Sequence, residues 1–279
     1  MVKGYSVTLL LAVAAGVGLY APVLAGLVRQ WWIEPASSYG LVLIIVAAVV
    51  VQRRWQQWRA LPLQPSDGGL AMVTAGLLIF AAGTITGDVF ILRVSLPLVI
   101  VGAVLSLGGW QHLRLMVAPL GLLVLAIPLP AVVVTHATMP LQLIASQVAA
   151  GVLQACQVSV LREGNLLMLN RVTLEVADAC SGLRSLVSLV SLTAVCAAFF
   201  SMSPSRVALL MVAAVPIAIV GNGLRVAATG LLSTWIGEAA ARGFVHDLTG
   251  YAAFAAMCAI IVGLQIAAKP RSVHAVVGV

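Results

Sequence analysis

Apolar runs about 20 residues long recur along almost the whole chain, and they restrict its fold more than any other feature. A helix of that length crosses the hydrocarbon core of a lipid bilayer. The runs predict membrane spans at residues 6–28, 37–51, 69–87, 89–108, 113–135, 181–200, 206–226 and 250–268. We therefore predict an all-α membrane protein, a polytopic helical bundle of about eight transmembrane helices.

The composition excludes other classes of protein. Hydrophobic residues make up 62% of the chain and charged residues only 8%. A soluble domain carries about a quarter of its residues as charged side chains, because its surface must be hydrated. This excludes a cytosolic enzyme, a secreted disulfide scaffold and a disordered chain. We treat residues 1–279 as a single multi-pass membrane domain.

The few charged residues predict the orientation in the membrane. With a cytoplasmic N-terminus, the inner segments carry eight basic residues and one acidic residue: Lys3, Arg53, Arg54, Arg59, Asp67, Arg114, Arg206, Lys269 and Arg271. The other seven arginines and seven acidic residues cancel, so the net charge of +7 falls on one side. The positive-inside rule then predicts that both termini are cytoplasmic. The basic residues are scattered between apolar runs, which argues against a nucleic-acid partner.

Residues 136–179 form the longest region between predicted spans, and we expect them at the outer face as an interfacial or re-entrant region. Residues 141–156 predict a helix that lies in the interface or packs on the bundle. Residues 158–176 are rich in β-branched side chains and contain the turn signal Gly164-Asn165. They predict a short strand pair that leads into Cys180.

The first of three polar clusters at predicted span ends contains Cys180 and Arg184. Four residues apart, these side chains share one face of a helix. A guanidinium and a helix N-terminus both favour the thiolate form of a cysteine. The simpler interpretation is an inert cysteine and an arginine that reaches toward head groups. We apply that interpretation to Cys196 and Cys258, which lie deep in apolar runs.

The second cluster contains Asn222 and Arg225, and the third contains His246 and Asp247. Arg225 lies at the end of a span on the side that the positive-inside rule disfavours, which suggests a specific partner. His246 can exchange a proton near neutral pH, and Asp247 either restrains it or is solvated. Each cluster taken alone is also compatible with a surface role.

Together the clusters supply the groups of a cysteine acyl-transfer site, if the three spans converge. The imidazole would take the proton of the thiol and later protonate the leaving amine. An arginine would stabilise the oxyanion or bind a substrate carboxylate.

The three clusters also carry a family resemblance. The segments LEVADACSGLRSL, AIVGNGLRV and HDLTG resemble, in order and spacing, the signature blocks of the exosortase/archaeosortase family of membrane cysteine transpeptidases. The resemblance extends over residues 31–251. In one block, Ser38-Tyr39-Gly40, the chain departs from the Ser-His-Gly of many relatives.

The resemblance implies an enzyme that recognises the C-terminal sorting tail of exported proteins, which in bacteria has a Pro-Glu-Pro motif, an apolar span and a basic end. It implies that Cys180 is the nucleophile and that His246 and Arg225 are the catalytic histidine and arginine. Arg184, Asn222 and Asp247 would have supporting roles. The cleaved protein would pass to a cell-envelope acceptor at the periplasmic face of the bacterial inner membrane. We expect no cofactor and no metal ion.

Two other classes of protein remain as alternatives, a membrane transporter and a structural membrane subunit without catalysis. Transporters place charged residues near the bilayer midplane, whereas most charges here lie at predicted span ends. The chain has no H-E-x-x-H motif and no cluster of acidic residues within one span. Metalloprotease and aspartyl protease mechanisms therefore lack their residues.

Overall fold

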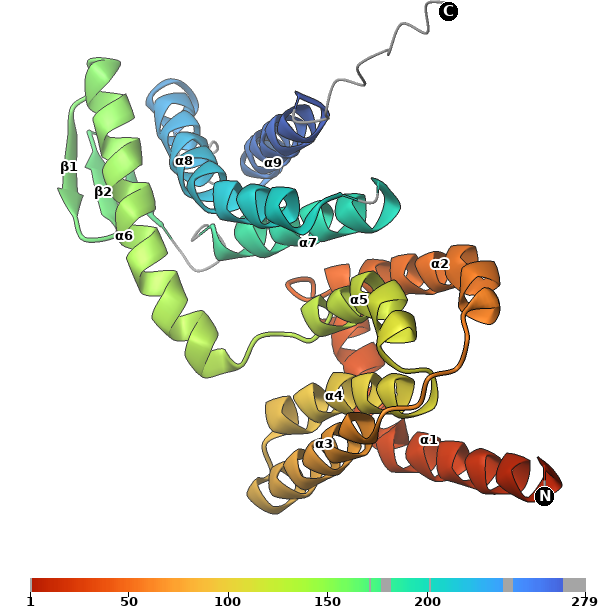
Figure 1. Cartoon of the computed structure of the whole chain (residues 1–279). Helices are drawn as coiled ribbons and strands as arrows, with labels where there is room; N and C mark the ends of the chain where they lie inside the picture. Colours follow the sequence, from red (N-terminus) through yellow and green to blue (C-terminus); the bar gives the residue numbers. More distant parts are fainter. Residues whose placement is uncertain (1, 171, 177–181, 201, 238–242, 268–279) are drawn as a thin grey trace, which may run out of the picture. The chain divides into compact units, whose positions relative to one another are not determined.

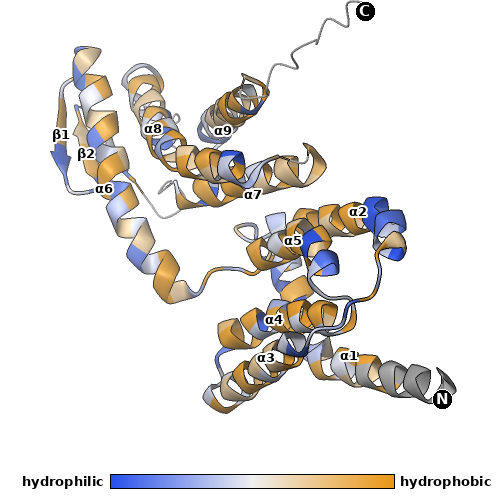
Figure 2. Cartoon of the chain, viewed as in Figure 1, coloured by the Kyte–Doolittle hydropathy of each residue, from blue (hydrophilic) through white to orange (hydrophobic). Residues whose placement is uncertain are grey.

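The computed structural model describes residues 2–170, 172–176, 182–200, 202–237 and 243–267. The chain divides into two compact units, Met1–Pro130 and Ala131–Val279. Within the described ranges, eight helices are long and apolar enough to cross a membrane. Figure 2 shows that hydrophobic residues dominate these helices. The prediction of an all-α polytopic membrane protein is confirmed.

The first unit consists of helices α1 (Val2–Ile33), α2 (Tyr39–Ala60), α3 (Asp67–Thr86), α4 (Val89–Leu107) and α5 (Trp110–Leu125) (Figure 1). The C-terminal part of α2 packs on the start of α5. There the Arg54 guanidinium donates to the carbonyl oxygen of Leu115 at 2.6 Å. The Trp58 ring meets the ring of the buried His112 edge-on, with 4.5 Å between the ring centroids. These contacts make α2 and α5 antiparallel neighbours.

Glycines seven residues apart bring α3 and α4 into close contact. A Cβ atom on Gly69 would lie 2.3 Å from the backbone nitrogen of Ser106, and one on Gly83 would lie 2.9 Å from that of Leu92. Gly76, between them, lies against Val99 in the same way. Small residues at a helix interface allow backbones to approach closely, which is how helices associate in lipid.

Gly40 has a packing role in the Ser38-Tyr39-Gly40 block. A Cβ atom there would lie 2.2 Å from Nε1 of Trp31. The Trp31 indole is only 4% exposed, and its Nε1 donates to the carbonyl oxygen of Ala126 at 2.9 Å. The glycine thus makes room for an indole that links α1 and α2 to the end of α5.

The second unit contains helices α6 (Ala131–Ala155), α7 (Leu183–Phe200), α8 (Pro204–Ile236) and α9 (Phe244–Ala267), with strands β1 (Val160–Glu163), β2 (Leu166–Leu169) and β3 (Thr173–Glu175). The strands form an antiparallel sheet in the order β1-β2-β3. Glu163 pairs with Leu166 across the turn, where Gly164 has a φ of +62°. The predicted strand pair is confirmed, and a third strand lies in the same interval.

One face of the sheet packs on α6 and α8. Leu167 and Val176 are almost fully buried there, with Ala149 and Leu153 of α6. Gly230 of α8 allows this approach, because a Cβ atom on it would lie 3.0 Å from Leu153. A second apolar cluster joins α7, α8 and α9 through Leu189, Ala214, Ala218, Met257 and Ile261.

The predicted single span at residues 113–135 is wrong. Helix α5 ends at Leu125 and α6 begins at Ala131. Pro128 and Pro130 lie between them, and proline lacks the backbone donor that a helix interior needs and disfavours helical geometry in the preceding residue. The eight candidate spans therefore include α6, whereas α5 is a shorter apolar helix. The outer-face position of residues 136–179 stays a prediction.

Candidate active site

Helix α8 carries Asn222 and Arg225 on one face, directed toward its neighbours α7 and α9. Asn222 is only 1% exposed. The chain that enters α7 passes directly over it, because a Cβ atom on Gly182 would lie 3.2 Å from Cβ of Asn222. Gly182 has a φ of +85°, a conformation that favours glycine. Gly182, two residues after Cys180 in the sequence, is thus in contact with the Asn222 face of α8.

Arg225 of α8 contacts His246, in the first turn of α9. The distance between Nη2 of Arg225 and Nε2 of His246 is 3.3 Å, and both side chains are half-buried. Gly250, one turn further along α9, provides space for the guanidinium. A Cβ atom on Gly250 would lie 2.9 Å from Nη2 of Arg225 and 3.1 Å from Cζ.

The chemistry of the two groups fixes the direction of this hydrogen bond. A guanidinium has five N–H donors and no acceptor, so Arg225 donates and Nε2 of His246 accepts. The proton of a neutral His246 ring is then on Nδ1. Nε of Arg225 is buried and has no hydrogen-bond partner among the residues that the structure describes.

Two threonines also lie against each other between α8 and α9. Their hydroxyl oxygens, Oγ1 of Thr229 and Oγ1 of Thr249, are 3.4 Å apart. Thr229 donates to the carbonyl oxygen of Arg225 at 3.1 Å, and Thr249 donates to that of His246 at 2.8 Å. Because each hydroxyl donates its one proton within its own helix, the two oxygen atoms form a close contact beside the Arg225–His246 pair. Sequence reasoning missed both threonines, although each follows a predicted site residue by one helical turn.

The other predicted site residues have different surroundings. Cys180 and its neighbours 177–181 lie outside the described residues. Arg184 and Asp247 are exposed. The structure therefore joins the second and third clusters through Arg225 and His246. Among the described residues, no group of three or more His, Cys, Asp or Glu side chains comes together as a metal site.

The family comparison covers this region. The model of the family "Transmembrane exosortase (Exosortase_EpsH)" matches residues 31–263. The chain belongs to the transmembrane exosortase family. Members of this family are membrane transpeptidases of the cysteine peptidase type that process exported proteins bearing sorting signals. The matched range includes all three polar clusters. No curated protein and no solved structure matches the chain.

Proposed function

We propose that this exosortase cleaves the C-terminal PEP-type sorting tail of exported proteins through a Cys180 acyl-enzyme and transfers the protein to a cell-envelope acceptor. The observation that carries the proposal is the contact between Arg225 and His246 on two neighbouring helices. Gly182, two residues after Cys180, packs on Asn222, one turn from Arg225 on α8. The position of Gly182 supports a site in which Cys180 acts beside a base and a permanent positive charge.

In the first half-reaction, the Cys180 sulfur attacks the carbonyl carbon of the scissile peptide bond, and the thiol proton passes to His246. The carbonyl oxygen becomes an oxyanion in the tetrahedral intermediate. When the carbon–nitrogen bond breaks, His246 returns its proton to the leaving nitrogen. The tail departs as a free amine, and the protein remains as a thioester of Cys180.

Arg225 has two partners in this scheme. In the resting arrangement its guanidinium donates to Nε2 of His246, the nitrogen that has the lone pair. His246 can take a proton on Nε2 only when this hydrogen bond opens. The released guanidinium can then donate to the oxyanion, where donors stabilise the transition state most strongly. Arg225 would therefore exchange the imidazole for the oxyanion as the reaction begins.

In the second half-reaction, a nucleophile of the envelope acceptor attacks the thioester carbonyl. Its proton passes to His246, and the new bond to the acyl group forms as the Cys180 thiolate leaves. The thiolate then recovers the proton from His246. Water in place of the acceptor gives hydrolysis.

The charge distribution supports a site on the periplasmic face of the inner membrane with both termini cytoplasmic. Figure 2 shows hydrophilic residues at one end of α2, which holds Arg53, Arg54 and Arg59. Basic residues at span ends are retained in the cytoplasm. His246 lies in the first turn of α9, whereas Lys269 follows the last turn of that helix in the sequence. If Lys269 is cytoplasmic, His246 is on the outer side.

The proposal is tested by co-expression with a secreted reporter that ends in a Pro-Glu-Pro motif, an apolar span and a basic cluster. Cys180→Ala and Cys180→Ser should abolish processing while the protein accumulates in the membrane as before. Cys156→Ala is the matched control, because Cys156 is an exposed cysteine at the end of α6. Unchanged processing by Cys180→Ala would contradict the proposal.

A further inference from the structure

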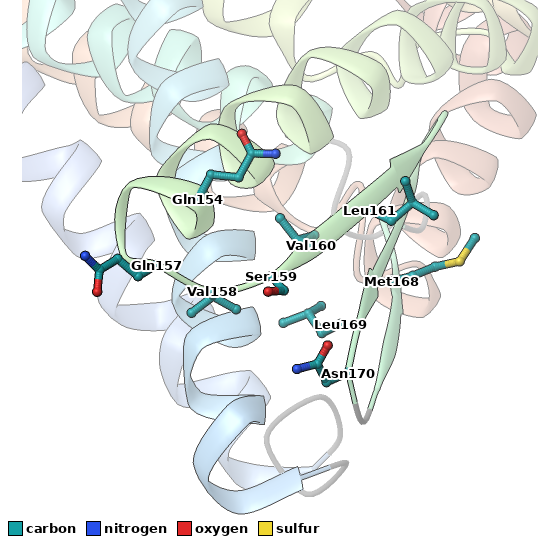
Figure 3. A pocket seen from close by; sticks show the side chains of 9 residues that line it. All are labelled: Gln154, Gln157, Val158, Ser159, Val160, Leu161, Met168, Leu169 and Asn170. Atoms are coloured by element: carbon teal, nitrogen blue, oxygen red, sulfur yellow. The ribbon is translucent and has the colours of Figure 1, made fainter.

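A groove lies beside the open end of the β1–β2 hairpin, where the last turn of α6 leads into β1 (Figure 3). Its volume is about 620 Å³. The walls carry the polar side chains of Gln154, Gln157, Ser159 and Asn170 beside aliphatic ones such as Leu161. All the described lining residues are uncharged. Amide groups offer both a donor and an acceptor, as a peptide backbone does.

The groove continues to α8. A second cavity of about 240 Å³ shares Val158, Ser159, Leu169 and Asn170 with the first. It adds Ser233 and Thr234, which lie near the C-terminal end of α8. The two cavities therefore adjoin at these shared residues, and together their walls include the end of α6, the hairpin and α8.

One face of α8 carries both a residue of this groove, Ser233, and Arg225 of the candidate active site, with the buried Thr229 between them. Ser233 donates to the carbonyl oxygen of Thr229 at 2.8 Å, and Thr229 donates to that of Arg225 at 3.1 Å. The three residues are four apart and share one face of the helix. Ser233 is eight residues from Arg225, or about 12 Å along the helix axis. About four residues of extended chain cover that distance.

The hairpin also has backbone groups that point away from its own strand pair. Strand β1 is an edge of the sheet, and three of its four residues are exposed. In the observed register, Glu163 and Leu166 form the pair next to a two-residue turn, which exchanges both hydrogen bonds. The N–H and C=O groups of Val160, three residues before Glu163, then point away from β2. A sheet edge of this kind binds extended peptides by strand addition.

We propose that this groove binds, in extended form, the part of the sorting tail that precedes the cleaved bond, and so leads that bond to Arg225 and His246. The inference rests on the proposed function, because it names the substrate segment of that same site. The uncharged amide, hydroxyl and aliphatic lining fits a peptide backbone with small or apolar side chains. The order of the sequence supports this arrangement. Val172 lines the groove, β3 follows it directly, and Cys180 comes shortly after β3 in the sequence.

The first experiment is photo-crosslinking with the full-length Cys180→Ala protein in membranes, so that bound substrate is not turned over. Benzoylphenylalanine replaces Ser159, directly before β1 in the groove, or, as the matched control, Glu163 at the end of β1 outside the lining. The probe is the reporter with the Pro-Glu-Pro tail. We expect a crosslink from position 159 to residues before the cleavage site, and none from position 163. Equal crosslinking at both positions, no crosslink to the reporter, or crosslinks to lipid alone would contradict the inference.

The second experiment separates this inference from the proposed function. Ser159→Trp fills the groove and should raise KM for the reporter about tenfold, with kcat changed by less than about twofold. Glu163→Trp should leave both constants unchanged. If the wild-type protein does not process the reporter, the proposed function fails. If the wild-type protein processes it and Ser159→Trp has an unchanged KM at equal membrane abundance, the groove inference fails alone.

Discussion

Nη2 of Arg225 lies 3.3 Å from Nε2 of His246, so a permanent cation and a titratable ring from two different helices are in direct contact. Gly250 permits this contact, because it has no side chain and the guanidinium of Arg225 occupies the space where a Cβ atom would be. The arrangement gives each of these three residues a separable physical role.

Gly250→Ala should reduce processing by roughly tenfold to a hundredfold, because a small displacement of a positioned group can reduce rates by that amount. The new Cβ atom would lie 2.9 Å from Nη2 of Arg225, so the guanidinium has to move. Gly263→Ala is a matched control on the same helix, since a Cβ atom there meets nothing within 4 Å. The measurement is the initial rate of reporter processing, normalised to membrane abundance. Equal rates for the two variants would count against the packing argument.

Arg225→Lys should lower the processing rate by about a hundredfold or more, a typical loss when an oxyanion donor is removed. Lysine keeps the charge but has a single ammonium group, which cannot reproduce the spaced donors of the guanidinium. Arg29→Lys is the control, because Arg29 is an exposed arginine of α1. Near-normal processing by Arg225→Lys would show that charge alone suffices and would remove the exchange of partners proposed for Arg225.

His246→Gln should lower processing by about a hundredfold to ten-thousandfold, because glutamine can accept a hydrogen bond but cannot carry a proton between thiol and amine. Crosslinking of the reporter at position 159 should persist in this variant, which separates lost chemistry from lost binding. Asp247→Asn should have a small effect, because Asp247 is exposed. A larger loss in Asp247→Asn than in His246→Gln would reverse these assignments.

Gly76→Val should destabilise the first unit by about 1–3 kcal/mol, the usual effect of excess volume in a tight interface. A Cβ atom at this position would lie 2.6 Å from Cγ2 of Val99 and 3.1 Å from its backbone nitrogen. Gly121→Val is the control, since Gly121 is exposed on α5 and a Cβ atom there meets nothing within 4 Å. Thermal unfolding of the full-length protein in detergent checks the difference, and equal midpoints would contradict the close-packing account.

Much of the helical fold could be predicted from sequence, because a lipid environment requires long apolar helices and each one is a local property of the chain. The break between α5 and α6 was also visible in Pro128 and Pro130, but the apolar character of the segment outweighed that signal in the prediction. The third strand was missed because Thr173–Glu175 is only three residues long. Its stability depends on pairing with β2, which local pattern does not show.

The candidate site could be predicted only in part. Spacing along one helix placed Asn222 and Arg225 on a common face, since that is a local property. The approach of His246 to Arg225 depends on the packing of α8 on α9, and the role of Gly250 depends on where the guanidinium lies. Neither follows from spacing. The close contact between Thr229 and Thr249 likewise becomes visible only when the two helices are seen together.

The most direct test of the central claim is detection of the acyl-enzyme itself. Membranes that contain the full-length protein and the Pro-Glu-Pro reporter are quenched in acid, and the peptide that carries Cys180 is analysed by mass spectrometry. The account predicts a thioester adduct on Cys180 that ends at the cleavage site, is removed by hydroxylamine and is absent in Cys180→Ala. An adduct on another residue, or continued processing by Cys180→Ala, would contradict it.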